Sequence, residues 1–262
     1  VDVLGRPGGV NGLHAVVVEG TRGERILGML RHGPQRDVAA EQFFTDVAHA
    51  AGMEDFVTPM ALAPDARSAI TQLIPHATLD AHGISSASAL ERAMARGYHA
   101  DGMRASEAAA TARVDRELAA SLDAITGHAD RHGGNALLDA STGRLTLIDH
   151  ELIGGGAYHG AFTGADLLHP LMQGGTPGRT RMIEGERVVL HRVQLSDEAL
   201  DHLAQVEPAA IRAAHDRLAQ TALPHAGDDM AAWIRSSTYV DQVTHRLQQI
   251  VHTGGWEYIA IA

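Results

Sequence analysis

The chain contains no cysteine and no lysine, and it has no apolar run that approaches the ~20 residues needed to span a bilayer. The absence of cysteine excludes disulfides, a thiolate nucleophile and zinc sites with cysteine ligands. The absence of lysine means that all 21 basic residues are arginine. Lysine is normally among the commonest residues, so its complete absence is unusual and limits the cationic groups that any site can use.

The charge balance is acidic, with 32 Asp and Glu and a formal net charge of −11. This balance disfavours polyanionic partners, so we expect no binding to nucleic acid by simple electrostatics. The first residues, VDVLGRPGGVNG, show no basic segment followed by an apolar one, so no secretory signal is visible there. Together with the absence of cysteine, this leads us to expect a cytoplasmic protein. The abundance of Ala, Arg and Gly indicates a GC-rich bacterial genome.

The first 80 residues have the pattern of a small strand-rich unit. Residues 12–33 predict two strands joined by a turn that contains glycine, and residues 37–51 have the apolar spacing of one helix. The segments FVTPMAL and RSAITQLIP then predict two short strands. We therefore take residues 1–80 as a first lobe of strands with one helix.

The remaining residues, 81–262, predict a larger helical lobe. Ala-rich amphipathic segments cover 85–97 and 106–126, and most of 196–252 has the same helical character. Between them, NALLD and RLTLID predict two strands joined by a turn. The predicted fold is therefore α+β, with two lobes that meet near residues 75–85.

The segment GHADRHGGNALLDASTGRLTLIDHEL, residues 127–152, carries the strongest chemical signal. It combines Asp130, Asn135 and, at the end of a predicted strand, Asp149. A helix, a polar loop and a hairpin would bring these three side chains around one cleft. One carboxylate can orient an acceptor hydroxyl, while an amide oxygen and a second carboxylate are suitable ligands for Mg²⁺ on a nucleotide.

At these residues the sequence resembles the protein-kinase-like superfamily, and most closely its phosphoinositide-kinase-like branch with the bacterial HipA-type members. That branch carries an Asp-Arg-His-x-x-Asn loop, matched by DRHGGN from Asp130 to Asn135, and a metal-binding Asp at a strand end, matched by LIDHE at Asp149. The resemblance implies a phosphotransferase that uses ATP and Mg²⁺. Asp130 would be the catalytic base, with His132 in the same catalytic loop. His128 would take the structural His position before it, and Asn135 and Asp149 would bind the metal.

The resemblance extends more weakly through the first lobe. Gly8 and Gly9 lie in the segment that resembles a glycine loop over the phosphates, and the helix that carries Glu41 resembles the helix whose Glu pairs with a lysine. The segment AITQLIPHA resembles the hinge where adenine binds, around Gln72 to Ile74.

One departure from the family pattern concerns the phosphate-binding lysine, which should fall near Met29. Arg31 lies two residues further on, so in a strand its side chain shares the face of Met29 and could supply the missing charge. Three interpretations stay open: Arg31 replaces the lysine, the chain binds nucleotide without catalysing transfer, or Met29 is an engineered replacement that inactivates the site.

Three other interpretations of the same segment stay open at this stage. The spacing of HADRHGGN also fits the aminoglycoside and choline kinase-like branch, which would make the chain a small-molecule phosphotransferase. A direct Zn²⁺ site built on the HADRH cluster would instead make it a metal-dependent hydrolase. The loop could also be structural, with Arg131 pairing to a neighbouring carboxylate. The acceptor, a hydroxyl of a protein, a peptide or a small molecule, is not specified by the sequence.

Overall fold

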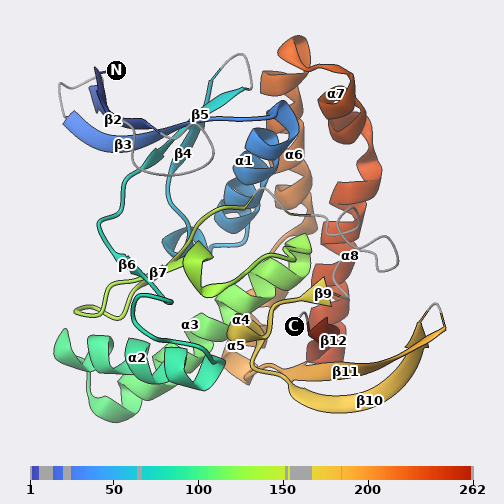
Figure 1. Ribbon diagram of the computed structural model, residues 1–262. Coiled ribbons are helices and arrows are strands. Elements are labelled where there is room, and N and C mark those ends of the chain that lie inside the picture. Colours follow the sequence, from blue (N-terminus) through green and yellow to red (C-terminus); the bar gives the residue numbers. More distant parts are fainter. Residues whose placement is uncertain are drawn as a thin grey trace.

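The computed structural model describes residues 2–5, 14–19, 25–63, 67–150, 153, 167–183 and 185–260 (Figure 1). The predicted α+β class is confirmed, because the first part of the chain is rich in strands and most of the second part is helical. The expected glycine loop at Gly8 and Gly9 lies outside the described residues. No helix in the described part of the chain combines the length and the apolarity needed to cross a membrane.

The first part of the chain forms an antiparallel five-stranded sheet in the order β1-β2-β3-β5-β4. Its strands are β1 (Asp2–Gly5), β2 (His14–Glu19), β3 (Arg25–His32), β4 (Met60–Leu62) and β5 (Ser68–Gln72). Both predicted strand pairs are therefore present. At Gly28 of β3 a Cβ atom would lie 3.1 Å from the carbonyl oxygen of Thr71 on β5, so a side chain there would press on the neighbouring strand.

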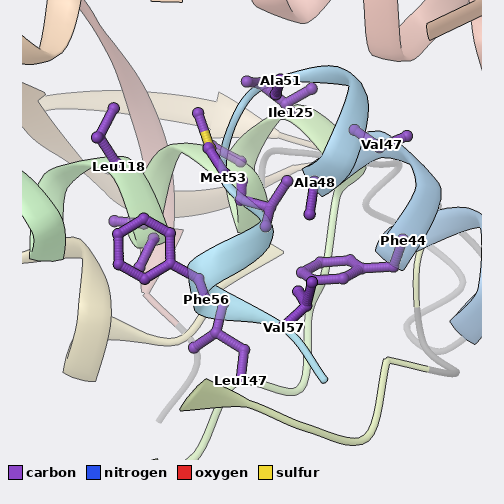
Figure 2. Packing of buried hydrophobic residues seen from close by; sticks show 14 of the residues in the cluster. Phe44, Val47, Ala48, Ala51, Met53, Phe56, Val57, Leu118, Ile125 and Leu147 are labelled. Carbon is purple, nitrogen blue, oxygen red and sulfur yellow. The ribbon is translucent and has the colours of Figure 1, made fainter. Parts of the chain in front are cut away.

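Helix α1 (Gln35–Ala50) connects the sheet with the helices of the second part. It packs against the sheet on one side and against α6 (Pro208–Ala222) and α7 (Asp228–Arg235) on the other (Figure 1). Its residues Phe43, Phe44 and Val47 are fully buried, and Figure 2 shows Phe44 and Val47 in one apolar cluster with residues of the second part. A single core thus joins the two predicted lobes.

The helical region surrounds the long, largely buried helix α3 (Ala105–Thr126). Gly127 ends this helix with a φ of +67°, a conformation that glycine adopts without steric cost. The other helices of the region, besides α6 and α7, are α2 (Ala87–Ala100), α4 (Pro170–Gln173), α5 (Asp197–Ala204) and α8 (Ser237–Thr253).

A small three-stranded sheet in the order β6-β7-β8 holds the segment with the candidate catalytic residues. Strands β7 (Ala136–Leu138) and β8 (Leu145–Leu147) form the predicted hairpin, and β6 (Ala77–Thr78) pairs with β7. Because β6 follows the five-stranded sheet directly, this pairing fixes where the chain passes from the first sheet to the helical region.

The prediction of an otherwise helical second lobe is incomplete, because this region also contains a four-stranded sheet. The sheet has the order β10-β11-β12-β9, with β9 (Leu167–Leu168), β10 (Thr176–Ile183), β11 (Glu186–Gln194) and β12 (Gly255–Ala260). Seven of the eight residues of β10 are exposed, so its sequence, TPGRTRMI, shows no apolar alternation from which a strand could be predicted.

The packing of α3 leads to a stability prediction. Leu122 is fully buried, so Leu122→Ala should lower the free energy of unfolding by about 2–5 kcal/mol. The control Leu27→Ala lies at a position that is 42% exposed and should cost no more than about 0.5 kcal/mol. Urea denaturation of both variants measures the difference, and equal losses would contradict the described core.

Candidate active site

A cavity of about 410 Å³ lies between the five-stranded sheet, α1 and the β7–β8 hairpin. Such a volume is in the range of small-molecule sites in proteins. Seven of the residues predicted from the sequence line it: Met29, Arg31, Glu41, Gln72, Ile74, Asn135 and Asp149. The sheet supplies three of them and the segment after β5 supplies Ile74, while α1 contributes one and the loop and hairpin the other two.

Arg31 joins three elements around this cavity. Its Nη1 lies 2.9 Å from Oε1 of Glu41 on α1 and 3.2 Å from Oδ1 of Asp149 after β8. The side chains of Arg31 and Glu41 are 12% and 9% exposed, while that of Asp149 is 42% exposed. The pairing of Arg31 with Glu41 holds a guanidinium on the strand face of Met29, the position at which the resemblance implies a cation.

The backbone at Asp149 is held by two contacts. Asp149 has a φ of +59°, the one positive value for a non-glycine residue in the described part of the chain. Asp tolerates this left-handed conformation better than most residues. Its carbonyl oxygen accepts a hydrogen bond from Nε2 of His128 at 3.0 Å, and the next amide, that of His150, donates to Oε1 of Glu41 at 3.3 Å.

The structure places His128 behind the cavity, away from solvent. The residue is fully buried, and burial, together with the nearby Arg131 guanidinium, lowers the pKa of His128 well below its usual range. The imidazole is therefore neutral near pH 7. Because a carbonyl can only accept, Nε2 must carry the hydrogen in the contact with Asp149, which suits the structural position that the sequence predicts for His128.

Arg131 is fully buried and every one of its N–H groups has an acceptor. Nε and Nη2 bind the Asp123 carboxylate of α3 at 3.0–3.2 Å, and Nη1 donates to the carbonyls of Asn135 and Ile148 at 2.6 and 2.7 Å. The remaining Nη2 hydrogen meets Nδ1 of His150 at 3.0 Å. Burial raises the pKa of Asp123, and the Arg131 guanidinium opposes that rise. The pairing of Arg131 with a carboxylate, considered from the sequence, is thus present.

The loop between Asp130 and Asn135 is shaped by its own hydrogen bonds. Nδ2 of Asn135 donates to the carbonyl of Asp130 at 2.9 Å and lies 3.5 Å from Oδ2 of its carboxylate. Nδ1 of His132 accepts from the amide of Gly134 at 3.0 Å. The side chains of Asp130 and His132 are 51% and 46% exposed, so both are open to solvent. Neither lines the cavity, but Asp130 adjoins Asn135, which does.

Steric crowding explains why this loop contains two adjacent glycines, Gly133 and Gly134. A Cβ atom at Gly133 would lie 2.0 Å from Oδ1 of Asp80, and one at Gly134 would lie 2.8 Å from Cε1 of His132. Neither position has room for a side chain without a shift of its neighbour. The glycines therefore allow Asp80 and His132 to pack closely on the loop.

Several residues of the site were not predicted from the sequence. Asp123 completes the Arg131 network from α3, and Asp80 packs against Gly133. His169, which precedes α4, is close enough for Asp130 and Asp80 to act on its pKa, although burial, the largest effect, lowers it. The sequence suggested that Arg131 could pair with a carboxylate, but not that the partner would be Asp123.

The geometry does not favour the direct zinc site of the alternative hypothesis. His128 is fully buried and bonded to the Asp149 carbonyl, whereas His132 is half-exposed and bonded to the Gly134 amide. Within the described ranges, no three His, Asp or Glu side chains are grouped so that they could hold a metal ion.

No family model and no curated protein matches the sequence. Among solved structures, the proinflammatory kinase CtkA of Helicobacter pylori matches with a TM-score of 0.53 and 11% identity, over 96% of this chain and 95% of that chain.

Two further solved structures match less well. HipA of Shewanella oneidensis MR-1, from a complex with HipB and operator DNA, has a TM-score of 0.47 and 12% identity over 95% of this chain and 66% of that chain. The FAT and kinase domain of CtTel1 has a TM-score of 0.41 and 13% identity over 91% of this chain and 20% of that chain. The CtkA match alone shows that this chain has a protein-kinase-like fold, which confirms the fold predicted from the loop and the strand-terminal Asp149.

The Arg131 network leads to a second prediction. Asp123→Ala leaves a buried guanidinium without its carboxylate and should lower the free energy of unfolding by about 3–5 kcal/mol. The double variant Asp123→Ala with Arg131→Met should lose less than the sum of the single losses, because it removes both buried charges. Chemical denaturation measures all three variants.

A matched control uses an exposed pair. Asp55→Ala removes the partner of Arg144, whose side chain is 64% exposed, and should cost at most about 1 kcal/mol. An Asp123→Ala loss as small as that of Asp55→Ala would contradict the role of the network.

Proposed function

We propose that this chain is a phosphotransferase that binds ATP and Mg²⁺ in the cavity and transfers the γ-phosphoryl group to a hydroxyl of a peptide or a small molecule. The proposal is supported by the arrangement of charged and polar side chains around one cavity. The ion pair of Arg31 with Glu41 lines the same cavity as Asn135 and Asp149. Asp130 adjoins Asn135. In kinases, phosphoryl transfer requires two features to be in place. One is an ion pair between a cation on a strand and a Glu on a helix, and the other is an Asp that binds the metal.

The inner part of the cavity suits a planar apolar ring. Met60, Leu73, Leu137 and Ile148 supply apolar surface, and the chain at Gln72 to Ile74 also lines this cavity. The backbone of this segment can supply polar groups to the edge of a base. We therefore assign the adenine to this end of the cavity.

The polar end of the cavity suits the phosphates and the metal. Arg31 is the cation that would meet the phosphates, and Glu41 holds it in position. The Nδ2 group of Asn135 is bonded to the Asp130 carbonyl, so its amide oxygen can turn toward a metal, as can the half-exposed carboxylate of Asp149. Mg²⁺ prefers such oxygen ligands and takes the rest of its shell from water and phosphate. When bound, Mg²⁺ would neutralise charge on the phosphates.

Asp130 is the residue proposed to orient the acceptor. Its carboxylate is half-exposed and adjoins Asn135, so an acceptor hydroxyl can approach it from solvent and still lie near the metal site. Asp80, which packs on Gly133 of the same loop, would border the acceptor. The neutral His128 behind the site keeps the backbone of Asp149 in place.

A test of these roles separates binding from transfer. Asp149→Asn should weaken ATP binding in the presence of Mg²⁺, because it removes a metal ligand. Asp130→Asn should leave that binding unchanged and reduce phosphoryl transfer by about 10²-fold or more, the usual contribution of a positioned base. Calorimetric titration with ATP, with and without Mg²⁺, measures binding, and formation of ADP from ATP measures transfer.

The exposed Asp101 provides a control, since Asp101→Asn changes the same functional group outside the cavity. Wild-type protein that binds no ATP under either condition would contradict the proposal as a whole. Unchanged turnover in Asp130→Asn would contradict the role of that residue alone.

The position of Met29 defines a second candidate function, a protein that binds nucleotide without catalysis. Met29 lines the cavity where the family pattern has lysine, and it carries no charge. If Arg31 replaces that lysine, Arg31→Ala should weaken Mg²⁺-dependent ATP binding by about 10-fold or more. Met29→Lys should then change turnover only slightly. A large gain of turnover in Met29→Lys would instead show that the unaltered chain binds nucleotide and that the missing lysine disables transfer.

A further inference from the structure

A second cavity, separate from the candidate active site, lies between the four-stranded sheet and α8. It has a volume of about 460 Å³ and is walled by β10, β11 and β12 on one side and by the C-terminal half of α8 on the other. Figure 1 shows α8 running down to β12, with the β10–β11 hairpin beside it. None of its lining residues belongs to the cavity of the candidate active site.

The charge of this second cavity is opposite to that of the chain. Four of the 21 arginines of the protein line it, together with one carboxylate, although the chain has a net charge of −11. These residues are Arg179, Arg181, Arg192, Arg246 and Glu257. A concave surface with several guanidinium groups is a site for an anion.

The strand register explains why these side chains share a face. Arg181 of β10 lies opposite Val188 of β11, and Leu190 and Arg192 follow Val188 at steps of two residues. Arg192 in turn lies opposite Glu257 of β12. Arg187 pairs with Met182 in the alternate position, so its side chain belongs to the other face of the sheet.

The arginines differ in the partners that they already have. Arg179 donates to Oε2 of Glu257 at 2.6 and 3.1 Å, and Arg246 donates to the carbonyl of Ile125 at 3.3 Å. Arg181 and Arg192 are exposed, and within the described part of the chain neither forms an ion pair with a carboxylate. Two guanidinium groups in the cavity can therefore take up an anion without giving up a carboxylate.

We propose that this second cavity binds a phosphate monoester. A dianionic phosphate has three oxygens for the planar N–H pairs of several arginines, and a monoester keeps that group at the end of an organic body. The body has room because the cavity exceeds the size of a phosphate ion, and Leu190 and Ile250 give it apolar contact. The same chemistry is presented by a free phosphorylated metabolite and by a phosphorylated side chain of a peptide.

The cavity contains its own reporter. The chain has two tryptophans. Trp256 adjoins this cavity next to Glu257, with its Nε1 bonded to Oε1 of Gln173, while Trp233 lies elsewhere, packed on Phe43. In a Trp233→Phe background all tryptophan fluorescence comes from Trp256. Titration with free O-phosphoserine should change this fluorescence in a saturable way, whereas serine should leave it unchanged. A phosphoserine peptide and its unphosphorylated form provide the second arm.

Substitutions in the same background locate the binding. Arg181→Gln and Arg192→Gln should each weaken binding of O-phosphoserine by about 10-fold, the effect of losing a charge-assisted hydrogen bond. Arg187→Gln removes an equal charge from the opposite face of the same hairpin and should leave the affinity unchanged. Far-UV circular dichroism and the unfolding midpoint check that all three variants fold.

The outcomes separate this site from the candidate active site. Binding that survives Arg31→Ala but is lost in Arg181→Gln and Arg192→Gln places the phosphate in the second cavity, whatever the fate of ATP binding. Equal affinity for O-phosphoserine and the peptide assigns the site to a small molecule, and about 10-fold tighter binding of the peptide assigns it to a phosphorylated chain. No saturable change with either ligand, or an equal loss in Arg187→Gln, would overturn the proposal.

Discussion

The buried guanidinium of Arg131 holds together segments of the chain that approach the site from different directions. It binds the Asp123 carboxylate of α3, the carbonyls of Asn135 and Ile148 and the imidazole of His150. A charge without exposed surface is stable only when each of its N–H groups has an acceptor, because an unmet donor would remain desolvated. The positions of the loop and of the strand end relative to α3 therefore depend on this one side chain.

A second guanidinium, that of Arg31, acts from the other side of Asp149. It links β3 to Glu41 of α1, and Glu41 also accepts from the backbone amide of His150. Since α1 shares its core with the helical region through Phe43 and Phe44, the position of Glu41 is fixed by the packing of α1, in which Phe44 also stacks on His150 beside the cavity. Asp149 is thus held between Arg31 of β3 and His128, which follows α3. These contacts give a candidate metal ligand a defined position before any ligand is present.

Features could be predicted from the sequence where a short segment of the chain carried the whole pattern. Asp130, Asn135 and Asp149 lie within twenty residues, in a segment whose turns and strands have their own patterns, and Arg31 followed from the two-residue period of a strand. Asp123 could not be distinguished from any other polar residue of an amphipathic helix. Strand β10 escaped prediction because its side chains are exposed, so only its pairing with β11 defines it.

The absence of lysine also has a structural consequence at the candidate active site. A guanidinium spreads its charge over a plane and can meet two carboxylates at once, as Arg31 does with Glu41 and Asp149. Met29, two residues earlier on the same strand face, forms apolar wall of the cavity with Met60 and Leu137. Under the proposed function, Arg31 would supply the cation, and the position of Met29 would be free to contact a nucleotide base or sugar.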